Sequence, residues 1–135
     1  MQTKVNLKML DPRADFRRVT EGAAGFDVAF CGDSEIHIHG GQTVKLSTGL
    51  AFALERDTAM LILPRSGLTL KNSLRPANSP GVLDCDYRGE LFILLQNFGV
   101  ETQTVTPGQY IAQMMFVPYL TPSFQVTTEL EDTLR

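Results

Sequence analysis

Three short segments of this 135-residue chain combine residue types that can do chemistry. The first, Pro64 to Leu68, places a cation, a hydroxyl and a flexible backbone next to each other in Arg65, Ser66 and Gly67. Arginine can hold a phosphate through two N–H groups at once, and the hydroxyl adds a further donor. The segment is therefore a candidate phosphate-binding site, although an Arg-Ser-Gly turn also occurs as a purely structural element.

The second segment, Asn78 to Glu90, crowds carboxylates, an aromatic ring and an arginine between two apolar stretches. It predicts a hairpin whose tip is rich in functional groups. The plainer interpretation is a charged turn with a solvated salt bridge. Chemistry alone makes Asp84 and Asp86 equal candidates for a general base or a metal ligand.

The third segment, Pro107 to Gln113, indicates a turn that enters a buried strand. Gln113 stands as a polar residue inside an apolar run. A buried amide needs hydrogen-bond partners, which are supplied either by the protein or by a bound ligand.

Two histidines form a weaker candidate. His37 and His39 lie two positions apart in a predicted strand, so their side chains face the same side. They could share a metal ion, but no third ligand is close in the sequence. The favoured interpretation is a solvated strand face near a turn.

The elements that must position these residues are mainly strands, because apolar residues recur at every second position. The alternating positions are Val5, Leu7 and Met9; Ile36 and Ile38; Val44 and Leu46; and Leu50, Phe52 and Leu54. Continuous apolar runs at 59–63 and 91–95 predict strands buried on both faces. Glycine and proline turns punctuate these runs, which favours an all-β sandwich, jelly roll or barrel. One short helix is expected over 66–73, with Ser66 as its N-cap and an anion site at its start.

Composition bounds the remaining possibilities. A chain of this length forms one domain, here residues 1–135. The net charge of −3 argues against a nucleic-acid partner. No apolar run is long enough to span a membrane, and the N-terminus lacks a signal peptide. With only two cysteines, we expect a soluble intracellular protein of the cytoplasm or nucleus.

Taken together, the segments resemble the trimeric dUTP pyrophosphatase (dUTPase) family. Four of its motifs occur in order and cover nearly the whole chain: Ala24 to Asp27, Pro64 to Leu68, Gly81 to Glu90, and Pro107 to Gln113. The resemblance implies a jelly-roll-like β-sandwich with one short helix after Ser66. It also implies a homotrimer with sites between subunits, in which the C-terminal segment of about 120–135 reaches a neighbouring subunit.

The activity implied by this resemblance is the Mg²⁺-dependent hydrolysis of dUTP to dUMP and pyrophosphate. That reaction keeps uracil out of DNA and supplies dUMP for thymidylate synthesis. Asp84 would be the general base that orients a water toward the α-phosphorus. Asp27 and Gln113 would hold the metal in an outer-sphere role, through water.

The resemblance also assigns the substrate contacts. Tyr87 would stack under the deoxyribose and exclude a 2′-hydroxyl, while Phe92 lines the same pocket. Asp86 and Arg88 are assigned to structure, as an ion pair. The substrate-binding set implied is Arg65, Ser66, Gly67, Asn78, Gly81, Val82, Leu83, Asp84, Tyr87, Phe92 and Gln113.

Two alternatives stay open from the sequence. The family's glycine-rich tail, with an arginine and an aromatic, is expected to begin about where the sequence stops at Arg135. Either the sequence is truncated there or the protein lacks the lid, and without a lid we expect slow turnover or a non-catalytic nucleotide-binding or signalling protein. The second alternative is dCTP deaminase, which shares the fold. It has a glutamate at the position of Asp84 and Arg-Ser-Ser in place of 65–67.

Overall fold

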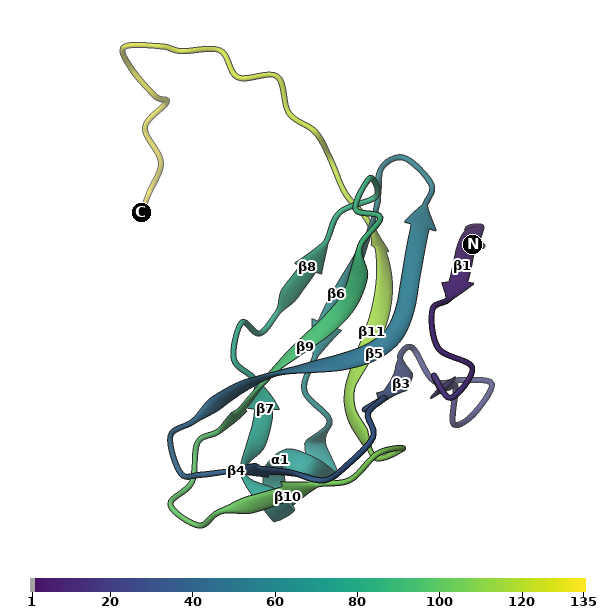
Figure 1. Cartoon of the computed structure of the whole chain (residues 1–135). Coiled ribbons are helices and arrows are strands. Elements are labelled where there is room, and N and C mark those ends of the chain that lie inside the picture. The colour runs from purple at the N-terminus through teal and green to yellow at the C-terminus, as the bar shows by residue number, and fades with distance from the viewer. Residues whose placement is uncertain (1) are drawn as a thin grey trace.

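A computed structural model describes residues 2–135, which form eleven strands and one helix (Figure 1). The bounds are β1 Val5–Met9, β2 Phe16–Arg17, β3 Phe26–Ala29, β4 Ile36–Ile38, β5 Thr43–Leu54, β6 Thr58–Leu63, α1 Ser66–Asn72, β7 Leu74–Pro76, β8 Gly81–Leu83, β9 Glu90–Asn97, β10 Gln103–Val105 and β11 Tyr110–Pro118. No helix within residues 2–135 is long and apolar enough to cross a membrane.

The strands form two main sheets and a small ribbon. One sheet has the order β1-β5-β9-β7, the other has the order β2-β3-β11-β6-β8, and β10 pairs with β4. Every paired neighbour is antiparallel. The all-β, jelly-roll-like sandwich predicted from the sequence is confirmed, and the one short helix lies in the expected segment.

The long strand β5 shows why the alternating pattern folds this way. Its core-facing side chains include Leu46, Leu50 and Phe52, all buried. The pairing of β5 with β9 shifts register between Ser47 and Ala51. Gly49 lies in this irregularity with a φ of +71°, and a Cβ there would lie 3.0 Å from the Cβ of Ala14. Only glycine adopts that backbone conformation readily, so it allows the strand to bend without leaving the sheet.

The prediction that the run 91–95 is buried on both faces is wrong for the single chain. Leu91, Ile93 and Leu95 are buried, whereas Phe92 and Leu94 are each 37% exposed. The reason is that β9 packs one face on the core and turns the other outward. The same prediction for the run 59–63 is wrong in part, because Leu61 and Leu63 are only half-buried.

The segment 78–90 is not a hairpin, contrary to the expectation from its sequence. β8 pairs with β6 in the five-stranded sheet, while β9 pairs with β5 and β7 in the other sheet. The loop between β8 and β9 therefore passes from one sheet to the other. A hairpin and a crossing between sheets both give two apolar stretches around a turn, so the sequence pattern could not distinguish these two arrangements.

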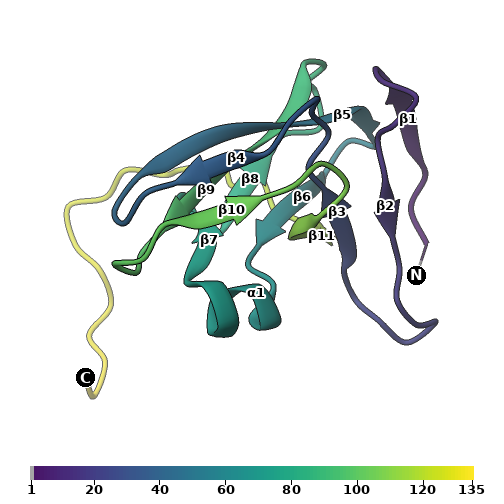
Figure 2. The same cartoon turned by 60° about the horizontal axis from the view of Figure 1, so that its bottom comes forward.

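The helix and the β4–β10 ribbon lie at one end of the sandwich (Figures 1 and 2). His37 and His39 are exposed on this ribbon and their Nδ1 atoms lie 3.0 and 3.1 Å from the hydroxyls of Thr104 and Thr102. No group of three possible metal-ligating side chains occurs in the described part of the chain. The interpretation of His37 and His39 as part of a solvated strand face is confirmed by their exposure.

A buried asparagine connects the segments at the end of the sandwich that carries the β4–β10 ribbon. Asn97 is fully buried, and its Nδ2 donates to the carbonyl oxygens of Ile38 at 2.9 Å and Glu101 at 2.7 Å. Its Oδ1 accepts from the backbone N–H of Gly99 at 3.0 Å. The side chain thus joins the end of β9 to β4 and to the loop before β10, with both ends of the amide satisfied.

Candidate active site

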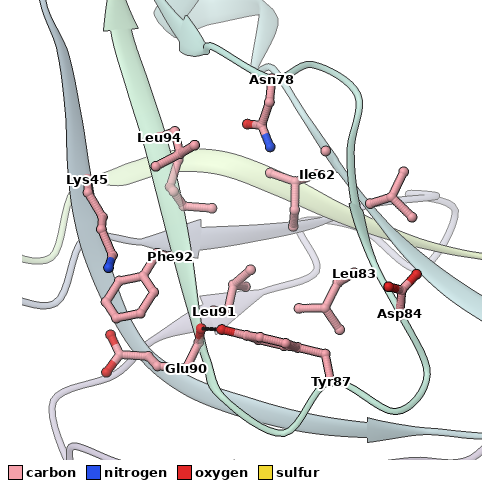
Figure 3. Close-up of a pocket in the computed structure, with 13 residues that line it drawn as sticks. Lys45, Ile62, Asn78, Leu83, Asp84, Tyr87, Glu90, Leu91, Phe92 and Leu94 are labelled. Carbon is pink, nitrogen blue, oxygen red and sulfur yellow. Dashed lines mark hydrogen bonds between the residues drawn. The ribbon is translucent and has the colours of Figure 1, made fainter.

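A pocket opens where β8 and β9 separate into different sheets (Figure 3). Its volume is about 400 Å³, which is within the range of small-molecule sites. It brings together seven residues of the substrate-binding set implied by the resemblance: Asn78, Gly81, Val82, Leu83, Asp84, Tyr87 and Phe92. Lys45, Glu90 and Leu94 also line it.

The two candidate carboxylates of the loop are distinguished by position. Asp84 lines the pocket, is exposed, and makes no side-chain hydrogen bond or ion pair within residues 2–135. Asp86 does not line the pocket. The expected ion pair between Asp86 and Arg88 is wrong, because the Arg88 guanidinium instead donates to the carbonyl oxygen of Cys85 at 2.7 Å. Asp84 is thus the carboxylate that is free to act on a bound molecule.

Tyr87 is held in place by its own loop. Its hydroxyl donates to the backbone carbonyl of Glu90 at 2.8 Å, as the dashed line in Figure 3 marks. Gly89 makes room for the ring, since a Cβ at that position would lie 2.7 Å from the hydroxyl oxygen. Across the pocket, the Lys45 ammonium lies 4.1 Å from the centroid of the Phe92 ring. Two aromatic rings therefore line the pocket, and that of Tyr87 is held in place by a hydrogen bond.

β8 gives the pocket a second recognition device. It is the edge strand of its sheet, and within residues 2–135 it pairs with β6 alone. An edge strand leaves backbone N–H and C=O groups on its outer side unpaired, and these can hydrogen-bond a ligand as a further strand would. This edge can read the polar rim of a planar base.

A second cluster forms in a row across the five-stranded sheet. Register pairs place Arg17 opposite Asp27, Asp27 opposite Gln113, and Gln113 opposite Leu63. Directly opposed residues have side chains on the same face. Arg65 follows two residues after Leu63, so it joins the same row. Segments far apart in the sequence meet here because strand pairing aligns them.

Asp27 is the centre of this row and is only 8% exposed. Its Oδ1 accepts from Arg65 Nε at 3.1 Å, and its Oδ2 accepts from Arg17 Nε at 3.2 Å. Arg65 Nη1 also donates to the carbonyl oxygen of Tyr110 at 3.0 Å. Such a buried carboxylate is stable only because both oxygens have charged partners. Asp27 thereby fixes the position of two guanidinium groups.

Gln113 finds the partner that its position requires. Its Nε2 donates to the carbonyl oxygen of Pro64 at 2.8 Å, which fixes the segment just before Arg65. The side chain packs over Gly25, where an added Cβ would collide with the amide oxygen. The glycine of the first motif is thus explained by close packing.

The start of α1 differs by one residue from the prediction. The N-cap is Arg65, with no side-chain cap, and Ser66 is the first helical residue. The cause is that Arg65 keeps the extended backbone of the preceding strand, with ψ of 124°. Ser66 and Gly67 are exposed beside Arg65, and the Ser66 hydroxyl has no side-chain hydrogen bond in the part of the chain described. The hydroxyl is therefore free to bind a ligand.

The pocket and the arginine cluster do not meet within one chain. Leu83 pairs with Met60 near the start of β6, and Asp84 continues beyond it. Arg65 follows the far end of β6 (Figure 1). At about 3.3 Å per residue the two lie about 20 Å apart along the strand.

Three residues of these sites were not assigned from the sequence. Arg17 belongs to β2, whose two residues are too few to give a periodic signal. Lys45 lines the pocket from β5, which is far in sequence from the segment 78–90. Tyr110 stood inside the third segment without a role. Its hydroxyl donates to Asp15 Oδ2 at 2.6 Å, and this hydrogen bond raises the pKa of Tyr110. Only the strand register shows that Arg17 and Tyr110 adjoin Asp27.

The pocket is large enough for a nucleoside, and the separate pair of arginines can bind phosphates. On a jelly-roll sandwich, this arrangement indicates a nucleotide-binding protein of the all-β class. The sequence profile of the dUTPase family matches residues 11–135. The chain belongs to the dUTPase family.

Similar proteins agree with this assignment. The deoxyuridine 5′-triphosphate nucleotidohydrolase of Serratia proteamaculans is 40% identical over 100% of this chain and 93% of its own length. The protein of the same name from Desulfotalea psychrophila is 44% identical over 86% of this chain and 77% of its own length. These relatives favour the dUTPase assignment over the dCTP deaminase alternative.

Solved structures share the fold. A mutant dUTPase of Staphylococcus bacteriophage 80alpha with dUpNHpp superposes with a TM-score of 0.84 at 20% identity, covering 96% of this chain and 91% of that one. A mutant dUTPase from phage phi11 of S. aureus, described with a structural Mg(II) ion, gives a TM-score of 0.83 at 19% identity over 96% of this chain and 99% of that one. These likenesses establish the jelly-roll architecture.

Proposed function

We propose that this protein hydrolyses dUTP to dUMP and pyrophosphate. The observation that carries the proposal is the pocket between β8 and β9 with Asp84 free at its side, in a chain of the dUTPase family. The reaction needs a site for a uracil nucleoside, a group that orients water, and cations for the phosphates. The residues described above supply each of these.

The nucleoside half of the reaction belongs to the pocket. The outer backbone edge of β8, from Gly81 to Leu83, hydrogen-bonds the uracil edge. A Cβ at Gly81 would lie 3.2 Å from that of Ile62 and 3.3 Å from the amide nitrogen of Asn78, so this strand already packs tightly. A tight pocket excludes a larger base by steric cost, which is how a thymine methyl group is rejected.

Tyr87 and Phe92 select the sugar. The Tyr87 ring packs against the deoxyribose, held by its hydrogen bond to the Glu90 carbonyl. A ring fixed in this way cannot retreat from a 2′-hydroxyl without losing that hydrogen bond. Phe92 covers the other side of the pocket, and its outward position on β9 leaves it free to do so.

Asp84 acts as the general base. Its carboxylate accepts a proton from a water aligned with the α-phosphorus as the water attacks. A general base contributes about 10²- to 10⁴-fold to the rate, so positioning and charge neutralisation must supply most of the acceleration.

The phosphate half of the reaction belongs to the arginine cluster. Arg65 is oriented by Asp27 and by the Tyr110 carbonyl, which leaves its second terminal amine for a phosphate oxygen. The free Ser66 hydroxyl and the exposed backbone of Gly67 add donors at the same place.

The donor set fits an outer-sphere magnesium ion. No three possible ligands gather in residues 2–135, and the Asp27 oxygens already hold two arginines. Asp27 and Gln113 would therefore meet a metal through its waters, which suits Mg²⁺ because it gives up water reluctantly. When bound, the ion neutralises phosphate charge.

The separation of the two halves supports an active site shared between chains. Asp84 and Arg65 lie at opposite ends of β6, so one triphosphate cannot bridge them within a single chain. A closed ring of identical subunits joins the pocket of one chain to the arginines of the next, and a homotrimer is the assembly we propose. The outward apolar side chains of β9 support burial against another subunit.

The C-terminal segment takes part in this assembly. Beyond β11 the chain leaves the sandwich in an extended course, from the end at which the loop after β8 lies (Figure 1). Leu120, Phe124 and Val126 are each more than four-fifths exposed. Apolar side chains spaced along such a segment support docking on a neighbouring subunit, over about residues 120–135.

Release of pyrophosphate from dUTP tests the function directly. Purified protein with Mg²⁺ should release pyrophosphate and dUMP from dUTP, and much less from dCTP, dTTP and UTP. Removal of the metal with a chelator should abolish release, and added Mg²⁺ should restore it. Ammonia release from dCTP, or no release from dUTP, would overturn the assignment.

A further inference from the structure

We propose that Arg17 is a second phosphate-binding cation of the site, paired with Arg65 across Asp27. The proposal rests on the proposed function, because it names a contact to the same triphosphate. β2 has only two residues, yet its pairing with β3 places Arg17 directly opposite Asp27.

The guanidinium groups of Arg17 and Arg65 share the single carboxylate of Asp27. The neighbouring carboxylate of Asp15 accepts from the Tyr110 hydroxyl and pairs with neither arginine. Two cations therefore meet at this spot, in a chain whose net charge is −3. The Arg17 side chain is 49% exposed, against 29% for Arg65, so both reach solvent while Asp27 stays covered.

Arg17 keeps its best donors free. Only its Nε is used, for Asp27 Oδ2 at 3.2 Å, and its terminal Nη1 and Nη2 have no hydrogen-bond partner in residues 2–135. These two amines form the planar fork that binds two phosphate oxygens at once. Asp27 holds the two guanidinium groups through their Nε atoms, so both present their outer amines on the same face of the sheet.

The guanidinium is also held in orientation before any ligand binds. It stacks on Tyr110, with its central carbon 4.1 Å from the ring centroid. The Tyr110 hydroxyl is in turn fixed by Asp15 at 2.6 Å. A side chain that is already ordered loses less entropy on binding, so more of the contact energy appears as affinity.

The neighbouring Arg18 provides a matched control. It carries the same charge one residue later, but its guanidinium lies over Phe26 at 5.9 Å and its Nε donates to the carbonyl oxygen of Ala23 at 2.9 Å. Arg18 lines a different, largely apolar groove with Phe16 and Phe26. Substitution of either arginine by glutamine removes one positive charge, and only Arg17→Gln removes it from the Asp27 row.

The test is calorimetric titration of wild type, Arg17→Gln, Arg17→Lys and Arg18→Gln with a non-hydrolysable dUTP analogue, inorganic tripolyphosphate and deoxyuridine. Arg17→Gln should weaken binding of the analogue and of tripolyphosphate by about tenfold or more, the size of one charge-assisted contact, and leave deoxyuridine unchanged. Arg17→Lys should recover part of the loss. Arg18→Gln should match wild type within about twofold.

The outcomes separate this proposal from the function itself. Equal phosphate affinities in Arg17→Gln and Arg18→Gln overturn the role of Arg17, whether or not wild type hydrolyses dUTP. A merely structural Arg17 would weaken deoxyuridine and tripolyphosphate alike and lower the thermal midpoint, which also overturns it. Wild type that binds tripolyphosphate through Arg17 but neither binds nor cleaves dUTP would refute the proposed function and leave the anion site standing.

Discussion

Asp84 and Arg65 are placed at opposite ends of the same strand. Asp84 follows Leu83, which pairs with Met60 near the start of β6, and Arg65 comes two residues after β6 ends. The register of three paired residues is enough to establish this, because each residue of a strand advances about 3.3 Å. The proposed general base and the proposed phosphate-binding arginine are thus separated by the length of β6 in one chain.

Mixed oligomers should therefore regain activity. Asp84→Asn and Arg65→Gln are each expected to be inactive alone. If the site takes Asp84 from one subunit and Arg65 from another, random mixing of the two variants in equal amounts makes about a quarter of the sites wild type, by the combinatorics of a closed ring. The measurement is pyrophosphate release after the variants are unfolded and refolded together.

The control is the same two variants refolded separately and then combined without exchange, which should stay inactive. Light scattering of the wild type should report about three times the 14.9 kDa chain mass. Failure of the co-refolded sample to recover any activity, at a trimeric mass, would show that each site lies within one chain.

Asp84→Asn should remove turnover and spare binding. The amide keeps the shape of the side chain but cannot accept a proton from water, so kcat should fall by at least about 10²-fold. The affinity for a non-hydrolysable dUTP analogue should stay within a few-fold, because in the proposed mode of binding the uracil contacts the backbone edge of β8. Asp86→Asn is the control and should keep near-normal kcat, since Asp86 does not line the pocket. The reverse pattern would make Asp86 the base.

Gly89→Ala should weaken sugar discrimination. A Cβ at Gly89 would lie 2.7 Å from the Tyr87 hydroxyl oxygen and 2.8 Å from the ring carbon that carries it. The ring must then shift and give up its hydrogen bond to Glu90. We expect the kcat/KM for dUTP to fall by about tenfold and the preference for dUTP over UTP to narrow, as expected when a positioning contact is lost.

Gly22→Ala is the matched control, because nothing lies within 4 Å of a Cβ there. It should behave like wild type in both rate and preference. An unchanged ratio of dUTP to UTP activity in Gly89→Ala would mean that Tyr87 does not select the sugar.

Much of the architecture could be predicted from the sequence because its cause is local. The alternation of apolar residues in 44–54 directly reflects one face of β5 on the core. The helix could be located because Pro64 ends a strand and Ser66, Gly67 and Leu68 follow. Local patterns of this kind need no knowledge of which strands pair.

Errors arose where pairing between distant segments decides the outcome. The segment 78–90 has the pattern of a hairpin, but β8 finds its partner in β6 and β9 finds its partners in β5 and β7. The run 91–95 is apolar on both faces, and a single chain covers only one of them. The sequence pattern indicated that both faces of β9 are apolar, but it carries no information on what covers the second face.

The candidate site divides in the same way. The pocket residues 78–92 are close in sequence, so one segment was enough to indicate them. The row of Arg17, Asp27 and Gln113 is assembled from three separate strands. Asp27 was found through a resemblance of motifs, and Gln113 as a polar residue inside an apolar run. Arg17 lies in no motif, and its place beside Asp27 became visible only from the strand register.

The last prediction concerns Asn97 and the stability of the fold. Its amide makes three hydrogen bonds in a fully buried position, two as donor and one as acceptor. Asn97→Ala leaves the buried carbonyl oxygen of Ile38 without that partner, and an unsatisfied buried group costs about 1–3 kcal/mol. The substitution also removes the part-buried hydrogen bonds to Glu101 and Gly99. We expect a loss of about 2–4 kcal/mol in the free energy of unfolding, measured in urea at fixed protein concentration so that any assembly contributes equally.

Asn72→Ala serves as control, because that side chain is half-buried and makes one side-chain hydrogen bond, to Gln103 at 3.1 Å. It should cost about 0.5–1.5 kcal/mol. Equal losses in the two variants would show that the buried amide adds no more than an ordinary half-exposed hydrogen bond, and that strand pairing and apolar packing hold the end of β9 without it.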